Sequence, residues 1–371
     1  MTNPLHRLHD AGQSIWLDFI DRQMLHNGDL SRRIRDDALT GMTSNPTIFE
    51  KALAEGAAYD DQIRTAPEKQ TAMELFELIE TTDVRDACDA FRGVHERSAG
   101  ADGFVSIEVS PGAANDTRET VAEAKRLWAT VDRPNVMIKV PGTIAGAAAV
   151  ARLIADGINV NITLLFAIDA YRRVIDAYMT GLEERRAAGH AVATVHSVAS
   201  FFVSRVDTEV DARLAKTGAG TTLAGRAAIA NAKLAYRLFS EQVSTPRWRA
   251  LARAGATVQR PLWASTSTKN PAYRDVMYVE QLIGPDTVNT MPPQTLEAFR
   301  DHGQVQRTID DDLAGAERTI RDLEAAGVSM ASVTDKLLQD GLASFQKSFD
   351  TLIAGLRAKT KSLGRDLVAS R

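Results

Sequence analysis

The stretch that decides the fold is Val136-Met137-Ile138-Lys139-Val140-Pro141-Gly142-Thr143, an apolar run with one lysine inside it. Its apolar and β-branched residues predict a buried strand. The next segment, 144–155, predicts a helix, because Thr143 can cap its first turn and Gly157 lies just past its end. A strand that passes directly into a helix is the repeating unit of a parallel α/β fold.

The lysine in this run, Lys139, has two interpretations. A lysine near a strand end can extend its aliphatic stem and keep its charge in water. A lysine held in a dry site can instead lose its proton near neutral pH, because desolvation disfavours the ammonium. The free amine is then the nucleophile that forms a Schiff base with a carbonyl. The run alone does not decide between the two.

Other segments alternate strictly between apolar and polar residues, so each strand has one apolar and one polar face. The polar residues of segments 158–163 and 105–110 are Asn159, Asn161, Thr163, Ser106, Glu108 and Ser110. Near the N-terminus, Trp16 and Asp18 alternate with Ile15, Leu17 and Phe19. A half-exposed antiparallel sheet also alternates, but helical segments between these strands favour parallel crossover units.

Eight strands are predicted, centred on Leu17, Met42, Ile107, Ile138, Val160, Val198, Trp263 and Val288. Helices are predicted at 29–39, 73–98, 117–130, 144–155, 167–188, 205–214, 222–243 and 293–301. Eight alternating units favour a single (β/α)8 TIM barrel over an open doubly wound sheet. The surplus over the ~250 residues of such a barrel predicts extra helices after the sixth strand, in 205–260, and at the C-terminus. We expect one α/β domain over 1–371, with its core at about 12–303 and a helical extension at about 304–365.

Composition bounds the function. Hydrophobic residues make up 44% and charged residues 25% of the 371 residues, and the net charge is -4, so neither a nucleic-acid nor a membrane partner is expected. Cys88 is the only cysteine, which excludes an intrachain disulfide, and we expect it in a buried helix. No metal-ligand spacing, glycine-rich phosphate loop, signal peptide or ~20-residue apolar span occurs. We therefore expect a cytoplasmic protein without metal or cofactor.

Chemistry in a TIM barrel gathers at the C-terminal ends of the strands. The polar residues predicted near those ends are Asp18, Asn45, Glu108, Lys139, Asn161, Thr163, Ser200, Arg205, Ser265 and Lys269. An amine, two carboxylates, amides, hydroxyls and basic groups fit Schiff-base carbon–carbon chemistry on a phosphorylated sugar. The amine forms the iminium, one carboxyl group moves protons as it forms, and another takes the proton of the hydroxyl next to the cleaved bond.

At these residues the sequence resembles the transaldolase family, from about Ile15 to Phe299. The pieces that carry the resemblance are IWLDFI, GMTSNPTIF, SIEVSP, MIKVPGT, GINVNITLLF, SFFVSR and WASTSTKNP. Their order and spacing together are specific, although no single piece is decisive. The later TMPPQTLEAF block and the chain length are similar to the long bacterial transaldolases.

The resemblance implies a role for each residue. Lys139 corresponds to the Schiff-base lysine, Asp18 to the base in cleavage, and Glu108 to an acid/base that acts through a water held by Thr163. The implied substrate-binding residues are Asn45, Asn161, Ser200, Phe202, Arg205, Ser265 and Lys269, with Ser200 and Arg205 at the phosphate.

Simpler interpretations stay open for the same residues. Asp18 could cap a helix, Asn45 could be a turn residue, and Glu108 could be a buried partner of Lys139 without proton transfer. Arg205 could form an ordinary ion pair. Asn161 and Thr163 could be barrel filling.

The chain departs from the family pattern at two places. Many transaldolases have a second phosphate-binding arginine after the seventh strand, where this chain has Lys269. A lysine supplies a point charge without the bidentate fork of arginine. The frequent Glu-x-Asp of the third strand is Glu108-Val109-Ser110 here, which leaves Ser110 without a role.

The activity that the resemblance implies is a cofactor-independent transaldolase of the pentose phosphate pathway. It transfers a dihydroxyacetone unit from sedoheptulose 7-phosphate to glyceraldehyde 3-phosphate, giving erythrose 4-phosphate and fructose 6-phosphate. A fructose-6-phosphate aldolase is the nearest alternative, but those chains are short and carry tyrosine in place of Phe202. A sugar-phosphate-binding barrel without chemistry would lack the lysine or a carboxylate, and none is missing. Monomer and homodimer both remain open.

Overall fold

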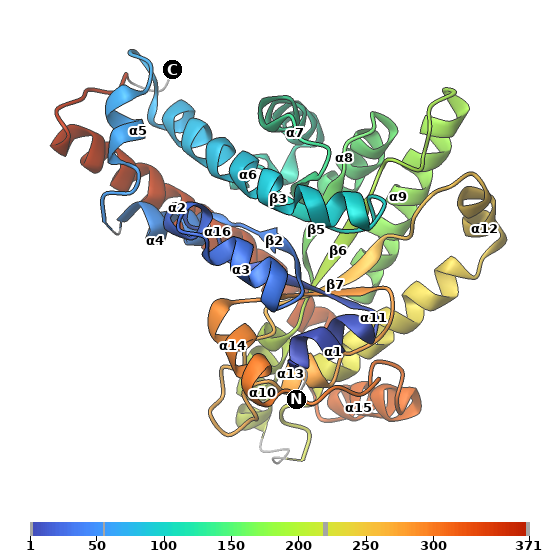
Figure 1. Ribbon diagram of the computed structural model, residues 1–371. Helices are drawn as coiled ribbons and strands as arrows, with labels where there is room; N and C mark the ends of the chain where they lie inside the picture. The colour runs from blue at the N-terminus through green and yellow to red at the C-terminus, as the bar shows by residue number, and fades with distance from the viewer. Residues whose placement is uncertain (1–2, 55, 218–221, 369–371) are drawn as a thin grey trace.

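The computed structural model describes residues 3–54, 56–217 and 222–368 (Figure 1). Eight parallel strands form a closed barrel in sequence order, with β1 paired to β8. The strands are β1 Gln13–Asp18, β2 Leu39–Thr43, β3 Phe104–Glu108, β4 Val136–Pro141, β5 Val160–Leu165, β6 Ser197–Phe202, β7 Arg260–Ala264 and β8 Thr287–Met291. The prediction of a (β/α)8 barrel is confirmed, and every predicted strand centre lies in a strand.

Helices surround the barrel. They are α1 Pro4–Asp10, α2 Arg22–His26, α3 Asp29–Asp36, α4 Pro46–Ala54, α5 Asp60–Thr65, α6 Ala72–Arg97, α7 Thr117–Val131, α8 Ile144–Ala155, α9 Ile168–Ala187, α10 Ser204–Thr217, α11 Ala227–Val243, α12 Pro246–Arg253, α13 Met277–Glu280, α14 Pro293–His302, α15 Leu313–Ala325 and α16 Met330–Ser362, with a 3-10 helix, η1, at Pro111–Asn115. Among these described helices, none combines the length and apolarity needed to cross a membrane.

The helix that was predicted after residues 136–143 forms as expected. Helix α8 spans the predicted residues, the Thr143 hydroxyl accepts a hydrogen bond from Gly146 N at 2.9 Å, and Gly157 has a φ of 90°. Three predicted boundaries were wrong by three or more residues. The helix predicted to end at 214 continues to Thr217 in α10. Helix α3 ends at Asp36 because Ala38 turns the chain with a φ of 51° and Leu39 opens β2. The helix predicted from Thr222 begins at Ala227.

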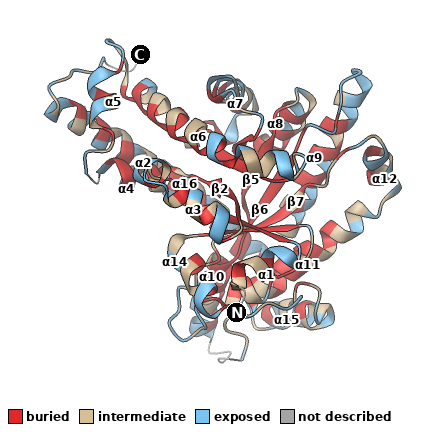
Figure 2. Ribbon diagram, viewed as in Figure 1, coloured by how far each residue is buried: buried red, intermediate tan, exposed pale blue. Residues whose placement is uncertain are grey.

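The polar faces of the alternating strands point into the barrel. Asn161 on β5 donates a hydrogen bond of 3.0 Å to Ser106 on β3, although β4 lies between these strands. The apolar residues on the other face, such as Ile107, Ile138 and Ile162, are fully buried under the helices. Figure 2 shows this concentration of buried residues along the strands, with exposed residues on the outer sides of the helices.

The interior towards the N-terminal ends of the strands is filled by a large side chain. Trp16 is fully buried, lies beside Gly41 in the register of β1 and β2, and donates a 2.9 Å hydrogen bond to Asp102. A Cβ atom added at Gly41 would lie 2.5 Å from the Trp16 ring. Position 41 therefore has no space for a side chain, because the indole of Trp16 fills the volume that a Cβ atom would need.

The last helix, α16, packs along the C-terminal side of the barrel against α4, η1, α10 and β5 (Figure 1). Thr47 on α4 donates a 2.8 Å hydrogen bond to Ser348 on α16. Gly341 allows close packing, because a Cβ atom there would lie 2.9 Å from the Leu164 side chain. The C-terminal extension thus contributes to the end of the barrel where chemistry is expected.

We predict that Gly41→Ala lowers the free energy of unfolding by about 1–3 kcal/mol, because the new methyl group must displace the Trp16 ring in a packed interior. Gly355→Ala on α16 is the matched control. A Cβ atom there meets nothing within 4 Å, so the change should be neutral or stabilise by up to about 1 kcal/mol. Urea unfolding of both variants measures the difference. Equal stabilities would contradict the close packing at Gly41.

Candidate active site

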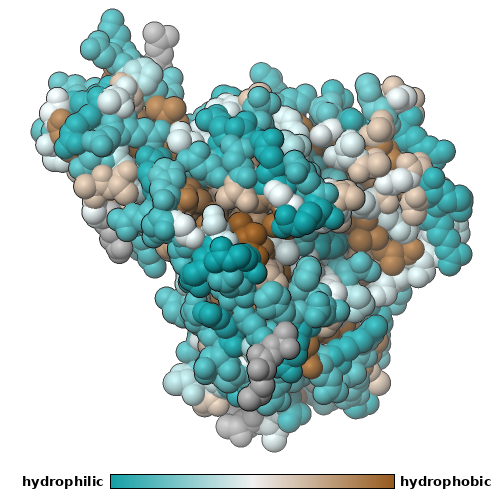
Figure 3. Space-filling view, in the orientation of Figure 1, coloured by the Kyte–Doolittle hydropathy of each residue, from teal (hydrophilic) through white to brown (hydrophobic). Residues whose placement is uncertain are grey.

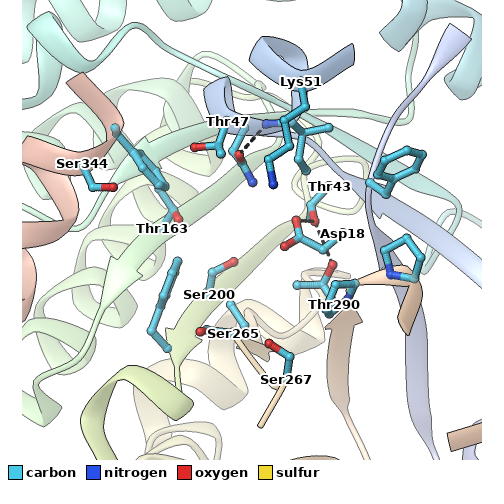
Figure 4. A pocket seen from close by; sticks show the side chains of 18 of the residues that line it. Asp18, Thr43, Thr47, Lys51, Thr163, Ser200, Ser265, Ser267, Thr290 and Ser344 are labelled. Carbon is cyan, nitrogen blue, oxygen red and sulfur yellow. Dashed lines mark hydrogen bonds between the residues drawn. The ribbon is translucent and has the colours of Figure 1, made fainter. Parts of the chain in front are cut away.

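A cavity of about 540 Å³ opens at the C-terminal ends of the strands (Figure 4). Nine of the eleven predicted site residues line it: Asp18, Asn45, Lys139, Thr163, Ser200, Phe202, Arg205, Ser265 and Lys269. The other two, Glu108 and Asn161, are buried in the wall behind these residues. The structure therefore brings the predicted residues of seven strands and their loops into one place.

Lys139 lies in the cavity wall and is 5% exposed. Its Nζ atom is 3.0 Å from Glu108 Oε2 and donates a 2.8 Å hydrogen bond to the carbonyl oxygen of Ser44. The strand register places Glu108 directly beside Lys139. Burial raises the pKa of Glu108, and Lys139 partly offsets that rise. Glu108 is therefore a carboxylate with an increased tendency to accept the proton of the amine.

Glu108 and Thr163 have hydrogen-bonding capacity that the described part of the protein does not use. The buried hydroxyl of Thr163 and both carboxylate oxygens of Glu108 lack a well-directed hydrogen-bond partner within the described chain, although Glu108 forms the ion pair with Lys139. Buried polar atoms without a protein partner mark places where a water or a substrate binds. A water that Thr163 holds and through which Glu108 acts stays a prediction.

Asp18 ends β1 and belongs to a hydroxyl network. It accepts a 2.7 Å hydrogen bond from Thr43, whose Oγ1 atom lies 2.8 Å from Oγ1 of Thr290, and Figure 4 shows the three side chains pointing toward one another. Burial raises the pKa of Asp18, while Lys139, the Thr43 hydrogen bond and two more distant cations lower it. Asp18 is not a helix cap, since Asp21 accepts the hydrogen bonds at the start of α2. The raised pKa suits a general base.

The two asparagines have different positions. The Asn45 side chain accepts a 3.1 Å hydrogen bond from Ile48 N at the start of α4 and also lines the cavity, so it is a turn residue within reach of a substrate. Asn161 is fully buried, and its amide donates to Ser106 and accepts a 2.7 Å hydrogen bond from Ser200. Asn161 thus orients Ser200, and its predicted contact with the sugar stays a prediction.

Basic side chains gather at another part of the wall. The Arg205 guanidinium lies 5.3 Å from the centre of the Phe202 ring, and no acidic side chain of the described residues forms an ion pair with it. Burial lowers the pKa of Arg205. The pKa of Lys269 is lowered mainly by burial and also by the positive charge of Arg205. Ser265 has a φ of 56°, and its hydroxyl lies 2.9 Å from that of Ser204 at the start of α10. Two cations held together beside a helix N-terminus suit a phosphate group.

Some lining residues were not predicted. They include Thr43, Lys51, Thr290, Ser344 and Phe345. Thr43 and Lys51 flank the predicted Asn45 in the sequence, so their position was a usable signal. Ser344 and Phe345 belong to α16, and nothing in their sequence indicates that this helix reaches the cavity.

Comparisons with known proteins agree with this geometry. The family model described as Transaldolase/Fructose-6-phosphate aldolase matches residues 15–356. The chain is 49% identical to a transaldolase of Parafrankia sp. (strain EAN1pec) over 98% of the chain and 99% of that protein. It is 49% identical to a transaldolase of Thermobifida fusca over 95% of the chain and 97% of that protein. It is 46% identical to a transaldolase of Mycolicibacterium smegmatis over 95% of the chain and 96% of that protein. The chain belongs to the transaldolase/fructose-6-phosphate aldolase family.

Proposed function

We propose that the chain transfers a dihydroxyacetone unit from sedoheptulose 7-phosphate to glyceraldehyde 3-phosphate through a Schiff base on Lys139. Transaldolase activity follows from the near full-length relatives. The observation that carries the mechanism is the buried Lys139–Glu108 contact of 3.0 Å in the wall of a cavity that also holds Arg205. A carbonyl that enters this cavity meets an amine and an acid/base together.

In the first step, Glu108 takes a proton from Lys139, and the amine attacks the C2 carbonyl of the ketose. Glu108 then returns the proton to the carbinolamine hydroxyl, which leaves as water and gives the iminium. The unpaired hydroxyl of Thr163 supplies a hydrogen bond to the water through which Glu108 acts. The protons balance, because the ammonium and the carbonyl together yield the iminium and one water.

In the second step, Asp18 takes the proton of the C4 hydroxyl. The C3–C4 bond breaks, its electron pair moves into the iminium to form an enamine, and erythrose 4-phosphate leaves. Glyceraldehyde 3-phosphate then enters, and the reverse of these steps gives fructose 6-phosphate. Arg205, Lys269 and Ser200 hold the phosphate, while Asn45 holds sugar hydroxyls, so the bound sugar keeps the reacting atoms in line.

We further infer that the C-terminal helices belong to the catalytic domain, since Ser344 and Phe345 of α16 line the cavity. All groups in the scheme are side chains of the chain, so it needs no metal or cofactor. We place the reaction in the cytoplasm and the pentose phosphate pathway, as its phosphorylated sugars imply. Phe202 under Arg205 favours transfer over an aldolase with tyrosine at that position, because phenylalanine has no hydroxyl to orient a water.

We predict that Lys139→Met reduces transfer to background, because no other group in the scheme can form the iminium. The measurement is erythrose 4-phosphate formed from sedoheptulose 7-phosphate and glyceraldehyde 3-phosphate. Lys51→Met is the matched control, since Lys51 lines the same cavity but forms no ion pair with a described residue. Loss of transfer in Lys51→Met with activity left in Lys139→Met would assign the nucleophile to Lys51.

We predict that Thr43→Val moves the acid limb of the pH profile of kcat/KM to higher pH. The Thr43 hydrogen bond lowers the pKa of Asp18, so its loss raises that pKa, and the ionised base is lost earlier as the pH falls. Thr290→Val is the control, because Thr290 bonds to Thr43 and not to Asp18. A limb that moves to lower pH in Thr43→Val would contradict the role of Asp18 as the base.

We predict that Arg205→Ala raises KM for phosphorylated substrates about 10- to 100-fold and changes kcat less. A charge-assisted contact acts on ground and transition states alike when it lies away from the reacting bond. Arg213→Ala on the same helix is the control, since Arg213 pairs with Glu209 outside the cavity. Equal losses with phosphorylated and unphosphorylated ketoses would place the phosphate elsewhere.

A further inference from the structure

Behind the Lys139–Glu108 pair lies a second, much smaller cavity, of about 10 Å³. Four glutamates from three elements line it: Glu77 and Glu80 on α6, Glu108 on β3 and Glu123 on α7. The volume is about that of one water-sized sphere. Since both oxygens of Glu108 are buried without a well-directed hydrogen-bond partner in the described chain, this cavity faces an acceptor that is not satisfied.

Two of the other glutamates are held by groups of their own. Glu123 accepts hydrogen bonds from Ser110 N at 3.1 Å and from the Ser110 hydroxyl at 2.8 Å, and Arg126 lies 3.7 Å from it. Glu77 is paired with Arg126 at 2.9 Å. These partners suit carboxylates and not carboxylic acids. They also give Ser110 a structural role, in place of the aspartate that is frequent in the family.

Glu80 differs from both. It is 6% exposed, and its side chain forms no hydrogen bond or ion pair with the described residues. Burial raises the pKa of Glu80 well above its ordinary value, the carboxylates of Glu123, Glu108 and Glu77 raise it further, and Lys139 opposes them. A negative charge here would have three carboxylates nearby and no bound cation, so the neutral acid is the favoured form.

We propose that Glu80 is a positioning residue for Glu108: as a neutral carboxylic acid it donates a hydrogen bond towards the free oxygen of Glu108, directly or through one water in the small cavity. The charged groups around this contact are Glu77, Glu123 and Arg126 from the helices, Lys139 from β4 and Asp18 from β1. The donated hydrogen bond favours ionised Glu108 and keeps its other oxygen on Lys139. The inference rests on the proposed acid/base function of Glu108.

The test is the pH dependence of borohydride trapping with fructose 6-phosphate in Glu80→Leu and Glu80→Gln. Leucine removes the donor, so the pKa of Glu108 should rise, the acid limb should move to higher pH, and trapping on that side should slow roughly tenfold. Glutamine keeps a neutral donor and should restore the profile. Glu96→Gln, an exposed glutamate on the same helix, is the control. An unmoved limb in Glu80→Leu, or a limb moved to lower pH in both variants because a charge was removed, would overturn the proposal.

A second measurement needs no activity and decides the question even if Glu80→Leu does not fold. Infrared spectra at neutral pH should show a carboxylic acid C=O stretch that disappears in Glu80→Gln, and its absence from the unmodified protein would also overturn the proposal. The variant Glu108→Gln distinguishes a failure of the proposed function of Glu108 from a failure of the inference about Glu80. If it traps like the unmodified protein, the proposed function of Glu108 fails. If it is impaired while Glu80→Leu is normal, only the inference about Glu80 fails.

Discussion

The contact on which the site depends is the buried pair between Lys139 and Glu108, 3.0 Å apart on neighbouring strands. Burying two charges is costly unless their geometry is good and further hydrogen bonds support them. The Ser44 carbonyl provides one such bond to the amine. The closed barrel makes the arrangement possible, because parallel strands in register set Glu108 beside Lys139 and keep both at the end where the cavity opens. The pair brings into contact the amine and the carboxylate that act as nucleophile and proton acceptor in the proposed mechanism.

Other side chains around the cavity have different properties from the Lys139–Glu108 pair. In the proposed mechanism Asp18 accepts a proton in the same cavity. Burial raises the pKa of Asp18, while Lys139 and the Thr43 hydroxyl lower it. Arg205 stands over Phe202 at another part of the wall and keeps its charge free for an anion. Helix α16 completes the enclosure with Ser344 and Phe345. Figure 3 shows that the face in view is mostly hydrophilic, with hydrophobic residues exposed in smaller areas between the hydrophilic ones.

Local patterns predicted the barrel and most of the residues that line the cavity. Alternation in 158–163 identified the inward face that holds Asn161 and Thr163, and Thr143 and Gly157 marked the ends of α8 because capping is local. Contacts between distant segments could not be predicted in this way. The approach of α16 to the cavity depends on packing of Gly341 on Leu164, and the role of Ser110 depends on Glu123 of the following helix. Neither leaves a periodic signal in the sequence.

The central claim is that Lys139 is the amine that forms the covalent intermediate. The most direct measurement is borohydride reduction in the presence of fructose 6-phosphate, followed by mass spectrometry of the proteolytic peptides. The account predicts one three-carbon adduct, on the peptide that contains Lys139, and none on the peptide that contains Lys51. An adduct on another lysine, or no adduct while the enzyme turns over, would contradict it.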